Sequence, residues 1–154
     1  MNELEYLKGN VAEIEISYKN NVKASERYRV RSSKDMYGLL MTLFNDGVID
    51  HHEQMILICM DKANKVLGYN IISSGGVSGT VVDPKIIFQI ALKMNASGII
   101  ISHNHPSGVT TPSDADIRIT RKIKDSGAML EIPVLDHLIV TSEGYYSFAD
   151  EGMM

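Results

Sequence analysis

Two histidines separated by a single residue, His103 and His105, are the feature of this sequence best suited to chemistry. They follow the apolar residues 98–101, a run that is typical of the end of a buried strand. Because side chains two positions apart on a strand point to the same side, both imidazoles should project together where the strand ends. A loop rich in proline and glycine then leads to residues 112–113, which are predicted to open a helix with Asp116 in its first turn.

Two imidazoles and one carboxylate in this arrangement predict three ligands for a zinc-like ion, with the fourth position open for water. Open coordination is typical of a catalytic metal site. Two structural interpretations compete with it. His103 and His105 fit a pair of surface histidines at the end of a strand, and Ser113 with Asp116 fits the capping box, in which the first residue caps a helix and the fourth reaches back.

The combined spacing, His-x-His followed by seven residues and Ser-x-x-Asp, resembles the JAMM motif of MPN-domain metalloproteases at every position. The amino-acid sequence of residues 103–108, which includes the two histidines, is similar to that of the bacterial RadC-like branch of that family. The literal string His-Asn-His does not indicate the nuclease family of that name, whose motif is spread over a ββα unit. The resemblance covers residues 34–150, and its further segments are Gly79 and Thr80, residues 83–85, Ala91 and Leu92, Asn95 and Ala96, and Asp136 and His137.

This resemblance implies the deaminase-like MPN fold and a zinc-dependent hydrolase of peptide or isopeptide bonds. His103, His105 and Asp116 would hold Zn²⁺. Glu53 stands where RadC-like chains place the general base, and Ser113 would donate a hydrogen bond to the oxyanion. The expected partner is a protein or peptide substrate.

The chemistry itself asks for a group such as Glu53. An attacking water must lose a proton and the leaving amine must gain one, and a carboxylate that does not ligate the metal can do both. The alternative is a solvated glutamate at the start of the strand predicted over residues 54–60. His51 and His52, just before it, should point to opposite faces and lie at the surface, where one could assist at the mouth of the site.

The length, charge and cysteine content of the chain restrict the classes of function that it can have. With 154 residues the chain should form one domain with a proper core, and its net charge of −4 and pI of about 5.7 disfavour a basic nucleic-acid footprint. The single cysteine, Cys59, lies in an apolar run and is expected in the core of a protein from a reducing compartment. Without an apolar run long enough to cross a membrane, and with a polar start, a cytoplasmic protein is the expectation.

The order of the predicted elements indicates an α/β sandwich with a mixed sheet. A strand-rich leader is expected over residues 1–33, with a hairpin formed by residues 11–19 and 22–30, followed by the metal domain over residues 34–150. Ser33 should cap a helix that ends near residue 46, and Asp83 a helix that reaches Asn95. Strands are predicted over residues 54–60, 66–72, 130–140 and 145–148, with residues 75–82 adding to the sheet.

Two other functions remain open. One is a non-catalytic partner-binding MPN module, although such scaffolds usually lack the ligand set that this chain keeps. The other is the DNA-repair association of the RadC-like family, which the acidic balance and the lack of helix-hairpin-helix glycines disfavour. Asp136 and His137, polar residues in an otherwise apolar strand, fit either a pair that orients a metal ligand or a satisfied structural pair.

Overall fold

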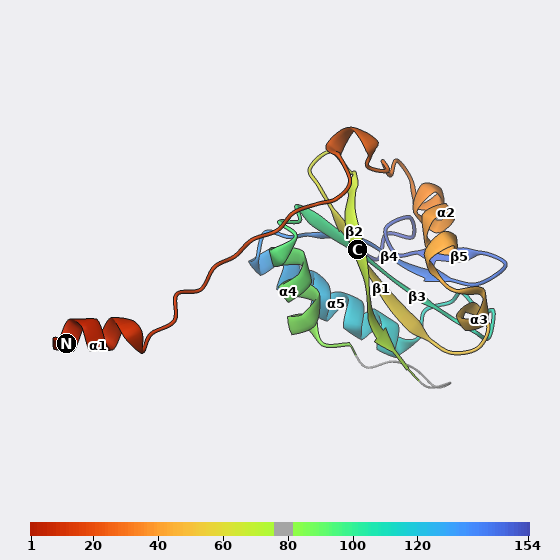
Figure 1. Cartoon of the computed structure of the whole chain (residues 1–154). Coiled ribbons are helices and arrows are strands. Elements are labelled where there is room, and N and C mark those ends of the chain that lie inside the picture. Colours follow the sequence, from red (N-terminus) through yellow and green to blue (C-terminus); the bar gives the residue numbers. More distant parts are fainter. Residues whose placement is uncertain (76–81) are drawn as a thin grey trace.

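The computed structural model describes residues 1–75 and 82–154. Figure 1 shows a twisted sheet with helices on both faces. The elements in chain order are α1 (Glu3–Gly9), the 3₁₀ turn η1 (Ala24–Glu26), α2 (Ser33–Leu43), α3 (Asp46–Ile49), β1 (Gln54–Met60), β2 (Val66–Ser74), α4 (Pro84–Lys93), β3 (Gly98–Asn104), α5 (Asp114–Met129), β4 (Val134–Val140) and β5 (Tyr145–Ser147). The predicted addition to the sheet over residues 75–82 falls mainly on residues 76–81, which lie outside the described residues.

The five strands form one mixed sheet in the order β2-β1-β3-β4-β5. β3 pairs with β1 in antiparallel fashion and with β4 in parallel, and the chain crosses from β3 to β4 through α5. β1 and β3 are buried along their whole length. The predicted α/β class with a mixed sheet is therefore confirmed, and β3 is the central strand that ends at the histidine pair.

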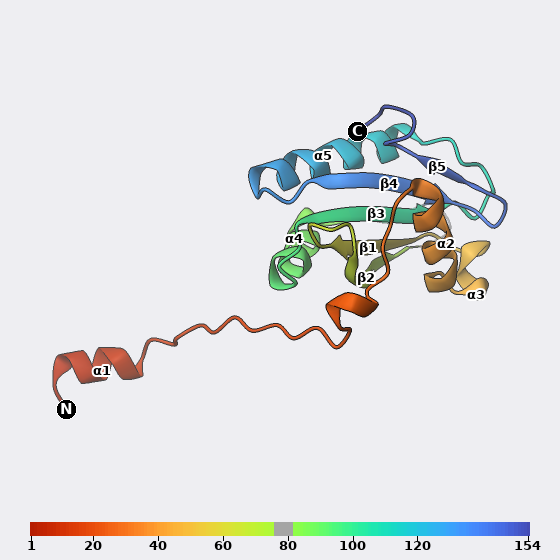
Figure 2. The same cartoon turned by 90° about the horizontal axis from the view of Figure 1, so that it is seen from above.

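The sheet separates two apolar cores, and Figure 2 shows the helices as layers on either side of it. One core lies under α4 and α5 and contains Ile99 and Ile101 of β3. The other lies under α2 and α3 and takes Ile100. Because strand side chains alternate between faces, His103 belongs to the α5 side and Asn104 to the α3 side.

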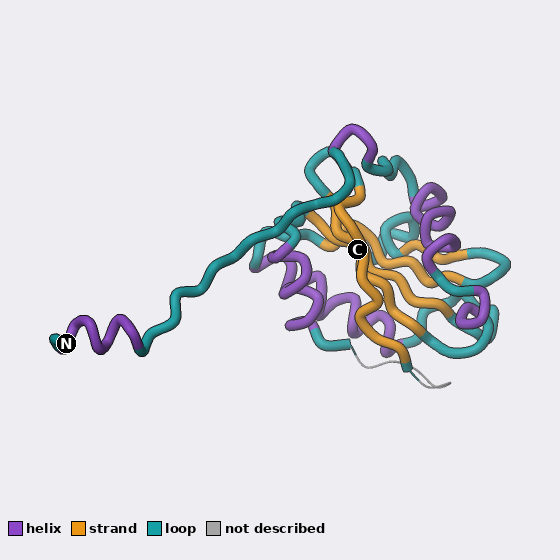
Figure 3. Tube along the Cα trace, viewed as in Figure 1, coloured by secondary structure: helices purple, strands orange, loops and turns teal. Residues whose placement is uncertain are grey.

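The predicted hairpin over residues 11–30 is wrong. Figure 3 shows loop between α1 and η1, and the strand-like pairing found in these residues is a single bridge between Arg29 and Lys65. In the first half of the predicted hairpin, Val11, Ile14 and Ile16 are exposed. Alternating apolar and polar residues predict a strand with one apolar and one polar face, but they do not supply the strand with which it must pair. An isolated hairpin has only marginal stability in water.

The helix starts follow their caps. Ser32, and not Ser33 as predicted, caps α2 by accepting a hydrogen bond from Asp35 N at 3.1 Å. Ser33 is already inside the helix, where its hydroxyl contacts Tyr145 and Asp150. α4 begins as expected, with Asp83 as its cap and proline at its first position. Among the described residues, no helix has the length and apolar character to cross a membrane.

Candidate metal centre

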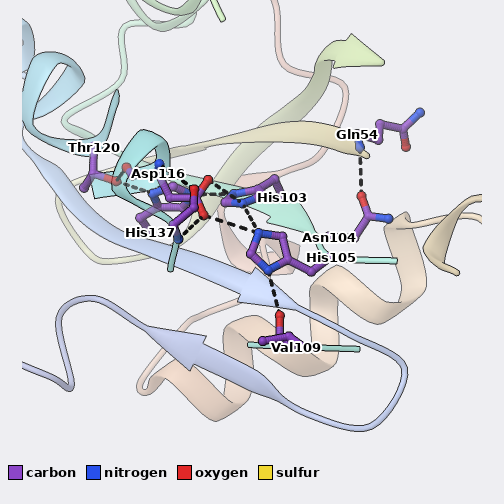
Figure 4. A network of polar contacts seen from close by, with 9 residues as sticks. Gln54, His103, Asn104, His105, Val109, Asp116, Thr120 and His137 are labelled. Atoms are coloured by element: carbon purple, nitrogen blue, oxygen red, sulfur yellow. Dashed lines mark hydrogen bonds and ion pairs between the residues drawn. The ribbon is translucent and has the colours of Figure 1, made fainter. Parts of the chain in front are cut away.

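The end of β3 and the start of α5 bring the three predicted metal ligands together (Figure 4). His103 lies on β3 with only 2% of its surface exposed, and His105 follows directly after the strand. Asp116 lies in the first turn of α5. β4 runs parallel to β3, so the chain must travel back along the sheet through α5 before β4 begins. The first turn of α5 therefore lies beside the end of β3, and the loop between them brings Asp116 to the two histidines.

The ligand atoms have the spacing that a metal ion requires. Nε2 of His103 lies 2.9 Å from Nε2 of His105 and 3.1 Å from Oδ1 of Asp116, and Nε2 of His105 lies 3.3 Å from Oδ2 of Asp116. Around a tetrahedral zinc ion with bonds of about 2.0 Å, neighbouring ligand atoms are about 3.3 Å apart. The two nitrogens and the Asp116 carboxylate therefore lie close enough together to share such an ion, with each residue offering one ligand atom within 4.8 Å of the others.

The surroundings of the cluster shift the pKa values of Asp116 and His105. Burial alone would raise the pKa of Asp116, but hydrogen bonds from His103 and His105 outweigh it and hold that pKa well below its usual range. The hydrogen bond that the His105 ring donates to the Asp116 carboxylate raises the pKa of His105, partly against the effect of burial. Nδ1 of His105 lies 2.7 Å from the carbonyl oxygen of Val109. Since a carbonyl only accepts, Nδ1 carries a hydrogen. When the ring gives up its second proton, the one on Nε2, that nitrogen presents a lone pair.

These shifts predict a pH window for the stability of the metal-free protein. The lowered pKa of Asp116 contributes stability above about pH 4, and this is lost as pH falls through that pKa. The raised pKa of His105 contributes stability below about pH 6.5, which is lost as pH rises through it. We expect the difference in free energy of unfolding between metal-free wild type and Asp116→Asn to be larger at pH 5.5 than at pH 9. Equal differences in urea titrations would contradict the ion pair.

Glu53 lies at the mouth of the cluster. It directly precedes β1, whose residue Met55 pairs with His103, and it lines the same cavity as His105. The Glu53 carboxylate contributes to the raised pKa of His105. Glu53 is half-buried and lines a cavity of about 360 Å³, together with Asp50, His51, His105, Pro106 and Ser107. Position and charge thus allow it to meet a water or substrate beside the cluster.

Ser113 forms the capping box that the sequence allowed. Its Oγ accepts a hydrogen bond from Asp116 N at 3.1 Å, and its own N–H donates to Oδ2 of Asp116 at 2.7 Å. The capping box orients the carboxylate toward the histidines. Ser113 is exposed, and because its oxygen acts as acceptor in the cap, its hydroxyl hydrogen is free to donate elsewhere.

Asn104, between the two histidines, is a residue that the sequence analysis missed. It is fully buried on the α3 side of the sheet. Its Oδ1 accepts from Gln54 N at 2.8 Å, and its Nδ2 donates to the carbonyls of Ile49 and His52, each at 2.9 Å. Asn104 thereby fastens the segment that carries Glu53 to the strand that carries the histidines. The signal was present: a polar residue at an inward position of a buried strand needs partners.

Replacing Asn104 by alanine should lower the free energy of unfolding by about 2–4 kcal/mol, because a buried N–H, a buried carbonyl and a partly buried carbonyl lose their partner. Chemical denaturation in urea measures the effect. Asn70→Ala, at an exposed position of β2, is the matched control and should stay within about 0.5 kcal/mol of wild type. Equal stability of the two variants would show that Asn104 does not hold this segment.

Asp136 and His137 point to opposite faces of the sheet and do not act as one pair. Asp136 accepts hydrogen bonds from Ser147 Oγ at 2.6 Å and Ala149 N at 2.9 Å, and so holds β5 and the turn after it. His137 faces α5, where its Nε2 lies 2.8 Å from Nδ1 of His103. Asp136 therefore fits the interpretation as a satisfied structural residue. His137 contacts a candidate metal ligand, as the other interpretation requires.

The remaining candidate side chains have simpler surroundings. His51 and His52 contact each other through their Nδ1 atoms at 2.9 Å, and His52 Nε2 also contacts Ser74 Oγ at 3.1 Å. His51 alone of this pair lines the cavity beside Glu53. Cys59 is completely buried in the core under α4, and burial raises the pKa of its thiol to about 12. Cys59 is thus a core residue, as predicted.

The fold and the cluster define a class: an α/β domain with a mixed sheet whose central strand ends in a His-x-His pair facing an aspartate at a helix start. The family described as RadC-like JAB domain matches residues 30–153. The chain belongs to this family.

Relatives from distant organisms agree with that assignment. A UPF0758 protein of Flavobacterium johnsoniae is 42% identical over 125 residues, which cover 81% of this chain and 53% of the relative. UPF0758 proteins of Thermotoga maritima and Methanosarcina barkeri are 42% and 36% identical, over 62% and 82% of this chain and 43% and 54% of their own lengths. The chain thus spans about half the length of these relatives, and their names state no activity.

Proposed function

We propose that this domain is a zinc-dependent hydrolase of amide bonds, in peptides or isopeptides. The observation that carries the proposal is the convergence of two Nε2 atoms and one carboxylate within 3.3 Å of one another, beside a cavity lined by a further carboxylate. Bound there by His103, His105 and Asp116, zinc would polarise a scissile carbonyl and acidify a water molecule. Nitrogen and oxygen donors in this number suit Zn²⁺.

The other residues have roles that their positions support. Glu53 takes a proton from the attacking water as its oxygen adds to the carbonyl carbon. The carbon–nitrogen bond then breaks, and Glu53 returns the proton to the departing nitrogen. Ser113 donates its free hydroxyl hydrogen to the oxyanion while its oxygen continues to cap α5.

Elemental analysis tests the metal site directly. Wild-type protein purified without chelator should contain about one zinc ion per chain, whereas His103→Ala should contain almost none, because the central nitrogen of the cluster is lost. Gel filtration and thermal unfolding would show that the variant is folded. Equal metal content in the two proteins would remove the basis of the proposal.

A further inference from the structure

A buried row of polar groups leads from the metal cluster into the core under α5. Nδ1 of His103 contacts Nε2 of His137 at 2.8 Å, and Nδ1 of His137 contacts Oγ1 of Thr120 at 2.6 Å. Oγ1 of Thr120 in turn contacts the backbone carbonyl oxygen of Asp116 at 2.6 Å. Figure 4 shows that the row starts at one candidate ligand and ends at the backbone of another. His137 is 0% exposed and Thr120 is 3% exposed.

The chemistry of the last contact determines where every hydrogen lies. A backbone carbonyl only accepts, so the Thr120 hydroxyl donates its single hydrogen to Asp116 O. The contact between Thr120 and His137 then needs the hydrogen on Nδ1 of His137. A neutral imidazole carries one hydrogen, so Nε2 of His137 accepts.

His137 is completely buried, and burial favours the neutral form of an imidazole. Its ring also lies flat against Phe148, with centroids 4.7 Å apart and an interplanar angle of 8°. The stacking holds the imidazole in the plane in which both nitrogens reach their partners. His103 must therefore donate from Nδ1. Its Nε2, which faces Asp116 and His105, is then the nitrogen that presents a lone pair to a metal ion once it carries no hydrogen.

We propose that Thr120 and His137 are positioning residues that hold His103 in the tautomer with its hydrogen on Nδ1, so that Nε2 is ready to bind a metal ion. The inference rests on the proposed metal site, since only a cation there makes use of this lone pair. Metal-bound histidines generally donate their second N–H to a fixed acceptor, and loss of that acceptor typically weakens metal binding about 10–100-fold. Here the acceptor is a second histidine, which is itself oriented by a threonine one helical turn after Asp116.

Thr120→Val tests the row at its far end, because valine keeps the shape of threonine and removes the hydroxyl while all three proposed ligand side chains stay in place. We expect the zinc affinity of the full chain, measured by competition with a chelator, to fall about 10–100-fold. In the metal-free protein, ¹⁵N–¹H correlation spectra should show the hydrogen of His137 on Nδ1 in wild type and not in Thr120→Val. Thr120→Ser, which restores the hydroxyl, should return both properties to the wild-type values.

A second pair of variants tests the same row at its centre. His137→Gln offers an amide oxygen to His103 and should bind zinc within a few-fold of wild type, whereas His137→Leu should show the full loss. Either pair is sufficient if one variant fails to fold.

Three outcomes would overturn the inference: a wild-type His137 with its hydrogen on Nε2, zinc affinity unchanged in Thr120→Val, or equal affinities of His137→Gln and His137→Leu. A wild-type protein that binds no zinc but keeps the hydrogen of His137 on Nδ1 would instead refute the proposed function. The hydrogen order in the row would still stand, so the two failures are distinguishable.

Discussion

Replacing Glu53 by glutamine is expected to lower turnover by about 10²–10⁴-fold, because glutamine cannot accept the proton of the attacking water or return it to the leaving nitrogen. The zinc content should stay at the wild-type level, since Glu53 lies outside the three-ligand cluster. Cleavage of a proteome-derived peptide library, followed by mass spectrometry, identifies a sequence that the wild type hydrolyses. Turnover of that peptide and elemental analysis then measure both properties.

Asp50→Asn is the matched control for Glu53→Gln. Asp50 lines the same cavity and also carries a carboxylate, so its replacement changes the charge by the same amount. We expect a much smaller effect on turnover if the role of Glu53 is proton transfer. Full activity of Glu53→Gln would show that another group is the base, and a joint loss of zinc and activity would make Glu53 a ligand.

Ser113→Ala should have two separable effects. Loss of an oxyanion donor typically lowers kcat by about 10²–10³-fold, and loss of a helix cap lowers the free energy of unfolding by about 1 kcal/mol. Ser113→Gly is the informative partner, because glycine at a helix cap costs only a few tenths of a kcal/mol. Both variants should therefore lose turnover equally while differing in stability.

Ser113→Thr, which keeps a hydroxyl, is the control for Ser113→Ala and should retain most of the activity and the cap. Steady-state kinetics on the peptide described above and urea denaturation measure the two quantities. Wild-type turnover in Ser113→Gly would reduce Ser113 to the capping role that its hydrogen bond to Asp116 N already shows.

The cluster of candidate ligands could be predicted from the sequence because it is local. His103, His105 and Asp116 belong to one strand, loop and helix, so the period of the strand and the position of the helix start determine their approach. The starts of α4 and α5 were equally predictable, since Asp83 and Ser113 cap through backbone groups two or three residues away.

Patterns that need a distant partner were less informative. The alternation in residues 11–19 predicted a strand, but the leader makes no ladder with the sheet in the described residues. A strand becomes stable only when neighbouring strands satisfy its hydrogen bonds. The sequence of the segment alone does not determine whether such a neighbouring strand is available.

The sequence alone therefore determined the α/β class, the main helices and strands, and three side chains suited to one metal ion. Only the tertiary structure decided what surrounds them: Asn104 fastening the segment of Glu53, and His137 with Thr120 behind His103. Those contacts join residues 50, 34 and 17 positions apart. They depend on strand order and on the parallel register of β3 with β4, which arise from packing of the whole sheet and not from any local pattern.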